Sequence, residues 1–334
     1  MAHDLEIKPD GTASAFFVGQ PAWHGLGTVL ENPPSVEEAL IAAGLDWKVK
    51  LAPIFHQKPL EGSENPNDVQ YHSIPEFQAT VRESDGKVLG VVGRKFVPLQ
   101  NVTAFQWFEP FVDSGAVTLE AAGALKEGKR VWVLAKLKAS EGGVEEIVPG
   151  DKVEQFILLA HAHDGSLAIR IGFTSVRVVC QNTLTAAISD NEASKLLKIR
   201  HTSYAPVALA VVREIIDTTR REFAANADVF RILAATGCDE LTLRKYVREV
   251  FEPGSGEKDE VLPRLVNNIV ELFQHGKGAE LGRGTLWNAY NSITEHVTHF
   301  QARSQDNRLD SQWFGKGASI IKRALEVATA LALK

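Results

Sequence analysis

One pattern occurs twice in this chain and limits the folds open to it. Asp85-Gly86 and Asp164-Gly165 each precede a β-rich run, and Gln100-Asn101 and Gln181-Asn182 follow those runs, 15 and 17 residues after the Asp. Asp-Gly favours a hairpin turn because Gly adopts positive φ freely, and Asn is a good N-cap where a strand passes into a helix. The alternative is that the paired amides reach a ligand. The pattern predicts two hairpin-helix units within one sheet.

The rest of the chain extends this organisation. Ser35 and Glu38 form a capping-box sequence, which predicts a short helix, and a further hairpin is expected from 117–124 and 129–137. After about residue 205, apolar residues recur at steps of three and four, as in helices. We therefore expect an α+β fold: an antiparallel sheet of hairpin-helix units and a mostly helical C-terminal region. Three parts are expected: an irregular acidic segment 1–70, an α+β core 71–205 and a helical region 206–334.

Composition excludes several classes of protein. The chain has 334 residues, 44% of them apolar, and a net charge of −6. No run approaches the roughly 20 apolar residues of a membrane span, and the polar N-terminus does not resemble a secretory signal. The two cysteines, Cys180 and Cys238, are too few for a disulfide scaffold. The sequence predicts a cytoplasmic protein that does not enter the membrane.

Catalytic and metal-binding motifs are weak. His161, His163 and Asp164 could supply metal ligands, but Asp164 also fits the hairpin turn. Cys180 could be a nucleophile, but its apolar strand favours burial. No phosphate loop, zinc-protease helix or nucleophile elbow occurs. We therefore expect no catalysis, cofactor or metal, and keep a metal-dependent hydrolase at His161, His163 and Asp164 as a third alternative.

Cationic and aromatic residues recur in the expected hairpins. A sheet face with guanidinium groups and aromatic rings suits single-stranded nucleic acid, through phosphate contacts and base stacking. The alternative is a solvated face with ordinary ion pairs, which the neutral balance of residues 71–334 favours. The candidate contacts are Arg94, Lys95, Lys129, Arg130, Arg170 and Arg177 for phosphates, with Phe96 or Trp132 for bases.

Several motifs resemble a known family. They are Trp23-His24-Gly25-Leu26-Gly27, Gly93-Arg94-Lys95-Phe96, Arg177-Val178-Val179-Cys180-Gln181-Asn182-Thr183-Leu184, Arg200-His201-Thr202 and Gly284-Thr285-Leu286-Trp287-Asn288-Ala289-Tyr290-Asn291. Together they resemble the phage/plasmid-like protein family, a domain of unknown function found in bacteriophages, plasmids and actinobacteria. A remoter similarity is to phage single-strand annealing proteins, which hold DNA strands in a basic groove and oligomerise. The acidic charge of this chain departs from that pattern.

These observations predict an accessory protein of phage or plasmid type that binds single-stranded DNA in recombination or replication. Single-stranded DNA and further copies of the chain are the expected partners. The alternative is an oligomeric scaffold or protein-interaction module that does not bind nucleic acid. Arg94 and Arg177 are expected at equivalent positions just before the two strand-to-helix junctions.

Overall fold

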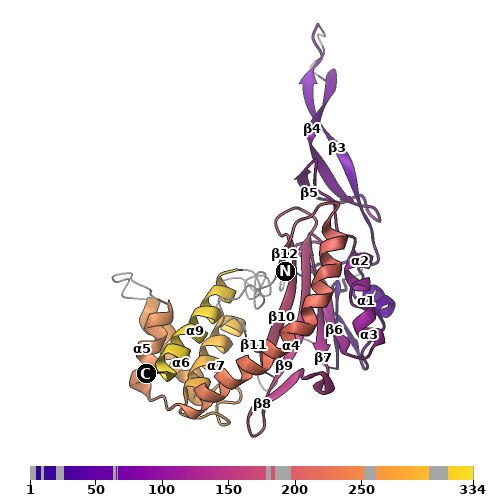
Figure 1. The fold of residues 1–334 in the computed structure, drawn as a ribbon. Coiled ribbons are helices and arrows are strands. Elements are labelled where there is room, and N and C mark those ends of the chain that lie inside the picture. The colour runs from indigo at the N-terminus through magenta and orange to yellow at the C-terminus, as the bar shows by residue number, and fades with distance from the viewer. Residues whose placement is uncertain are drawn as a thin grey trace.

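The fold is taken from a computed structural model. It describes residues 5–8, 11–19, 26–62, 65, 67–177, 182–184, 197–251, 261–300 and 315–333, and within these ranges the side chains of 182–184, 212–226 and 261–262 are not considered. Two sheets and a group of helices make up the described chain (Figure 1).

The larger sheet has nine strands, arranged around a path β11-β10-β9-β7-β6-β1-β2. Its neighbours pair antiparallel except β1 and β2, which are parallel, and β12 and β8 pair with β10 and β9 beside the path. The strands are β1 (Ala15–Val18), β2 (Thr28–Leu30), β6 (Val117–Leu125), β7 (Arg130–Leu137), β8 (Val144–Val148), β9 (Asp151–Ala162), β10 (Ile169–Arg177), β11 (Asn182–Leu184) and β12 (Leu197–Ile199).

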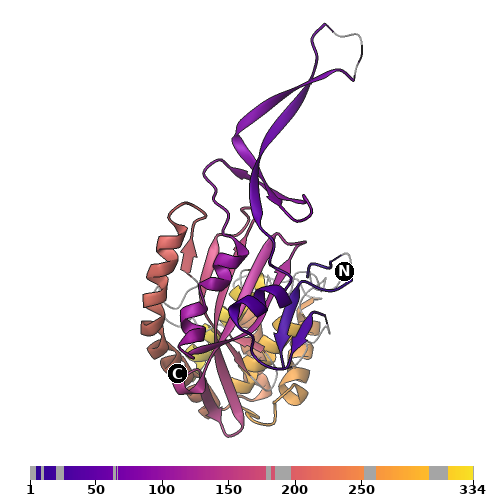
Figure 2. The same ribbon diagram turned by 90° about the vertical axis from the view of Figure 1, so that its right-hand side faces the viewer.

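A smaller sheet of three strands forms an arm that projects from the body (Figures 1 and 2). Its order is β3 (Val49–Pro59), β4 (Val69–Arg82) and β5 (Val88–Gly93). The outermost pairing of β5 joins Gly93 to Phe77, so the arm beyond that point consists of β3 and β4 alone. Tyr71 on this outer ribbon is 65% exposed.

One face of the large sheet is covered by helices. α1 (Val36–Ala42), α2 (Asn101–Gln106), α3 (Glu109–Asp113) and the start of α4 (Ala205–Ala235) pack there, around a core that includes Phe105, Leu119, Ile157 and Ile171. The N-terminal segment covers a separate apolar cluster that includes Leu5, Trp132 and Leu158. Burial of these side chains supplies the main stabilisation of the sheet.

The C-terminal helices form a second core beside the sheet. They are the far end of α4, α5 (Glu240–Phe251), α6 (Val261–His275), α7 (Leu286–Glu295), a π-helical turn η3 (His296–Phe300) and α9 (Lys316–Ala332), with a short 3-10 turn η1 (Ala139–Glu141) elsewhere. α7 is buried along its whole length. Among the described helices, none is long and apolar enough to cross a membrane.

The α+β fold with C-terminal helices is confirmed, as are the capping box at Ser35, the β6–β7 hairpin and both Asp-Gly turns. The two turns share one device: Asp85 accepts a hydrogen bond from the Lys87 amide, and Asp164 accepts one from Ser166. The expectation of a single sheet is wrong, because the first hairpin lies in the arm and the second in the large sheet.

The two hairpins nevertheless lie against each other. A Cβ added at Gly90, on β5, would come within 2.6 Å of the Asp164 Cα, so only glycine permits this approach. A Cβ at Gly165 would lie 3.4 Å from Val92 Cγ1. The repeat therefore places the base of the arm on the β9–β10 turn.

The capping interpretation of Gln100-Asn101 is wrong at the level of side chains. Gln100 makes no cap hydrogen bond and instead pairs with both the amide and the carbonyl of Val49. Asn101 donates to the carbonyls of Leu45 and Trp47. Both amides therefore fasten the root of the arm, because the chain entering β3 passes beside α2.

The second unit differs from the first at its end. Thr183 lies in strand β11, where a helix was expected to begin, and the rest of that expected helix lies outside the described residues, as do Cys180 and Gln181. The expected boundary near residue 70 falls inside the β3–β4 hairpin, whereas the one near 206 coincides with the start of α4. The first 70 residues therefore supply strand β3 and the start of β4.

Candidate functional site

A pocket of about 450 Å³ opens where the base of the arm meets the edge of the large sheet. Its walls come from the end of β5, the β9–β10 turn with the start of β10, and β12 with the residues that follow it. The lining residues are Gly93, Lys95, Phe96, Gly165, Ser166, Leu167, Ala168, Arg170, Lys198, Arg200, His201 and Thr202.

Four of the lining residues are cationic and none is acidic. Arg170 and Lys198 are direct partners across the β10–β12 pairing, while Lys95 and Arg200 enter from the adjoining segments. Among the described residues none of these four forms an ion pair, and the Nε of Arg170 is buried without a hydrogen-bond partner. Like charges on paired residues repel, so an anion between them would be stabilised.

An aromatic pair forms one wall of the pocket. The rings of Phe96 and His201 stack with centroids 4.7 Å apart and an interplanar angle of 24°. The Leu167 carbonyl lies 3.2 Å from His201 Nε2 and can only accept, which assigns the proton to Nε2. Burial lowers the pKa of His201, so this histidine is neutral at pH 7 and adds no charge to the wall.

Three of the eight sequence-predicted residues line the pocket: Lys95, Phe96 and Arg170. Arg130 lies beside it, because its guanidinium donates to Ser166 Oγ over 3.2 Å. Arg94 is exposed next to Lys95 but does not line the pocket, and Lys129 is half-buried at the β6–β7 turn. The structure therefore brings part of the predicted set together.

Trp132 cannot meet a ligand in this structure. It is 2% exposed and packs on β7 against Phe17, with ring centroids 6.4 Å apart. A base could stack on it only if the N-terminal segment left the sheet. We correct the expectation that Trp132 contacts bases.

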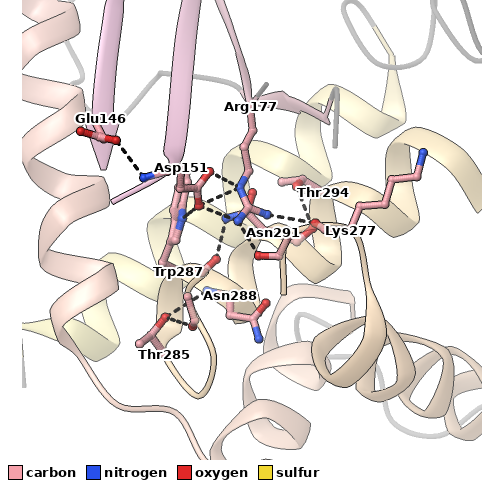
Figure 3. Close-up of polar contacts among 12 residues, drawn as sticks. Glu146, Asp151, Arg177, Lys277, Thr285, Trp287, Asn288, Asn291 and Thr294 are labelled. Carbon is pink, nitrogen blue, oxygen red and sulfur yellow. Dashed lines mark hydrogen bonds and ion pairs between the residues drawn. The ribbon is translucent and has the colours of Figure 1, made fainter. Parts of the chain in front are cut away.

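Arg177 is also removed from the candidate site. It is 1% exposed and pairs with Asp151, with Nε 2.8 Å from Oδ1 (Figure 3). Its guanidinium also donates to the Gly278 carbonyl and lies over the Trp287 ring, 5.6 Å from the centroid. The Trp287 indole completes the cluster by donating to Asp151 Oδ2 over 2.8 Å. The expectation of equivalent positions is wrong, because Arg94 is exposed and Arg177 is buried.

This buried cluster joins the sheet to the helical region, and we call it the seam: Asp151, Arg177 and Trp287. Thr285 caps α7 by accepting from the Asn288 amide (Figure 3). The side chain of Asn288 donates to the Phe273 carbonyl. The sequence motifs around Arg177 and Trp287 therefore serve, in the described residues, to dock α7 on the sheet.

Sequence reasoning missed Lys198 as a site residue and treated Arg200 and His201 only as part of a motif. The signal available was the alternation of Lys198 and Arg200 with the apolar residues Leu197 and Ile199 of the three-residue strand β12. Alternation over three residues is too short to predict a strand with its partner.

The structure does not favour the alternative of a metal-dependent hydrolase at His161, His163 and Asp164, because these side chains are buried or engaged elsewhere. His161 on β9 and His163 just after it are fully buried, and the described residues contain no group of three side chains suited to a metal ion. His163 Nε2 lies 3.0 Å from Asn101 Oδ1, and Asp164 accepts from the Ser166 amide. Burial depresses the pKa of His163 to about 3 and that of His161 well below its usual range. These histidines are neutral core residues beneath the pocket.

A scan against family models matches residues 88–313 to the family described as a domain of unknown function (DUF932), and the chain belongs to that family. The matched range contains the whole pocket and the seam, but omits β3 and β4. Searches of curated proteins and of solved structures return no significant match.

Proposed function

We propose that this protein binds single-stranded DNA, with the cationic pocket as the phosphate-binding site. The observation that carries the proposal is the convergence of Lys95, Arg170, Lys198 and Arg200 on one cavity without a lining carboxylate. Phosphate contacts supply most of the affinity of sequence-independent nucleic-acid binding. The net charge of −6 then restricts binding to this local patch.

Single strands fit the site better than a duplex. The cavity has the volume of a small-molecule site, and Phe96 presents a half-buried aromatic ring at its wall. A base in a single strand is free to leave its neighbours and stack on such a ring, whereas a paired base must first be extruded from the helix. Phe96 is therefore assigned the stacking role.

The biological setting is part of the same proposal. The motifs that resemble the phage/plasmid-like family, and the remoter similarity to single-strand annealing proteins, support a role in recombination or replication of phage or plasmid DNA. Strand binding by the pocket would be the physical step common to both processes, and no catalysis is required for it.

The test is fluorescence anisotropy of a labelled single-stranded oligonucleotide over a range of salt concentrations. The variant Arg170→Ala/Lys198→Ala should bind more weakly, and the slope of log K against log salt should become shallower by roughly 1.4, about 0.7 per phosphate contact. The matched control Lys245→Ala/Arg248→Ala removes the same charge from the exposed surface of α5. It should bind like the wild type.

Two results would contradict the proposal: no binding by the wild-type protein at low salt, or equal losses in the pocket variant and in the α5 control. The second result would mean that DNA responds to overall charge rather than to this pocket.

A second candidate function, protein interaction by an oligomeric scaffold, is favoured by the arm. Its strands expose the large apolar side chains of Phe55, Tyr71, Phe77 and Val91. Exposed apolar patches mark interaction sites, and aromatic residues are enriched at protein interfaces, where charged ones are depleted. Light scattering after size exclusion, with and without oligonucleotide, separates the candidates. An oligomer that forms without DNA and does not bind it supports the scaffold; a DNA-binding species supports the first proposal.

A further inference from the structure

The pocket holds more positive charge than a single phosphodiester group of a DNA backbone can neutralise. Lys95, Arg170, Lys198 and Arg200 line a single cavity of about 450 Å³. A protein that tracks a strand needs cations spread along a path, whereas Arg94, Lys129 and Arg130, the other exposed or half-exposed cationic candidates, do not line the cavity. The charge is concentrated at one point.

The cationic side chains of the pocket also offer more hydrogen-bond donors than a phosphodiester can use. A guanidinium offers five donors and an ammonium three. The Nε of Arg170 is buried and has no acceptor among the described residues, and Lys198 lies opposite on the paired strand. A donor that is buried and unpaired is unfavourable, so a turn of the half-buried Arg170 side chain that brings Nε to a ligand oxygen would remove that cost.

Phosphodiesters and phosphate monoesters differ in what they offer these donors. A backbone phosphodiester carries one negative charge on two free oxygens. A monoester carries about −1.5 to −2 charges at pH 7 and three acceptor oxygens. Three oxygens can accept a bidentate guanidinium and an ammonium together, and the second charge adds attraction to every cation in the cavity.

We infer that the group preferred by this pocket is a phosphate monoester, as found at the end of a DNA strand, rather than a phosphodiester within it. The inference rests on the proposed binding of single-stranded DNA and deepens it. In the bound state the Arg170 guanidinium donates hydrogen bonds to two oxygens of the terminal phosphate, Lys198 contacts the third, and Phe96 stacks on the terminal base.

The experiment compares binding of four probes of one sequence: an oligonucleotide with a 5′-phosphate, one with a 3′-phosphate, one with neither, and a circular strand without ends. One phosphorylated probe should bind about tenfold more tightly than the unphosphorylated and circular ones, the equivalent of one added charge-assisted hydrogen bond. The preferred end identifies the polarity of the bound strand. A mononucleotide should compete for the site.

Arg170→Ala and, separately, Lys198→Ala should abolish this preference, while Lys245→Ala on α5 should retain it. Lys198 is exposed, so its variant remains informative if Arg170→Ala folds poorly. Equal affinity for all four probes would overturn the inference but leave DNA binding intact. Absence of binding to every oligonucleotide would instead refute the proposed function. A mononucleotide that binds when no oligonucleotide does would support the monoester preference and identify a free nucleotide as its source.

Discussion

Strand β10 carries two arginines seven residues apart whose surroundings are opposite. Arg170 lies at the pocket, half-buried, opposite another cation and without an ion-pair partner among the described residues. Arg177 lies at the seam, fully buried, with Asp151, Trp287 and a backbone carbonyl around it. A charge whose partners are provided within the fold holds the fold together, whereas a charge left without them is available to a ligand.

The largest effect is expected from breaking the seam. Arg177→Ala leaves Asp151 buried without its cation and should lower the free energy of unfolding by about 3–5 kcal/mol. Chemical denaturation measures this loss. The double variant Arg177→Leu/Asp151→Leu removes both charges and should regain part of the stability. If Arg177→Ala unfolds at the wild-type midpoint, the seam does not stabilise the protein.

A second test uses pH to probe the histidines beneath the pocket. Burial lowers the pKa values of His161, His163 and His201 below 6.5 in the folded state, so the unfolded state binds more protons just below that pH. Stability should be complete above about pH 6.5 and fall on acidification, with His163 contributing about 1.4 kcal/mol per pH unit and His161 and His201 acting in the same direction. The fall from His163 ends near its folded pKa of about 3.

His161→Leu provides the control for this pH dependence. Neither ring nitrogen of His161 has a hydrogen-bond partner in the described part of the chain, so the substitution costs no such bond. Thermal unfolding between pH 5 and pH 8 should show a shallower slope for this variant than for the wild type. A wild-type stability that stays constant down to pH 5 would show that these histidines are not kept neutral.

A substitution at Trp287 separates the contribution of the tryptophan to the stability of the seam from that of the arginine. Trp287→Phe keeps an aromatic ring near Arg177 but removes the indole donor to Asp151. Loss of one hydrogen bond to a charged group should cost about 1.5–3 kcal/mol, less than loss of the arginine. Denaturation curves of both variants give the comparison. A loss equal to that of Arg177→Ala would assign the seam's stability to the tryptophan.

The smallest change in the free energy of unfolding is expected at the pocket, where a substitution should stabilise the protein rather than destabilise it. Lys198→Ala removes a like charge facing Arg170 and should leave stability unchanged or raise it by up to about 1 kcal/mol. The same variant should weaken DNA binding. Stability measured by denaturation and affinity measured by anisotropy would then change in opposite directions, whereas a clear loss of stability would mean that Lys198 has a structural role.

Sequence predicted those features that depend on neighbours in the chain. The Asp-Gly turns and the helix cap at Ser35 are local, and each is found where expected. Burial of Arg177 depends on Trp287, 110 positions along the chain, and burial of Trp132 depends on the N-terminal segment that packs over it. Neither dependence leaves a trace in residue spacing. Strand pairing brings Arg170 and Lys198 together, and Lys95 joins them because the arm sits on the β9–β10 turn, which no periodicity reveals.

The prolines of the arm have a consequence for the behaviour of the protein at high concentration. β3 is an edge strand, and an open edge invites other chains to add strands and build fibrils. Pro53 and Pro59 offer no N–H on this strand, and Lys50 and Lys58 place charge along it. A growing cross-β stack would find no continuous ladder there. Strand β3 therefore offers other chains a poor template, although the arm projects from the body with exposed aromatic side chains.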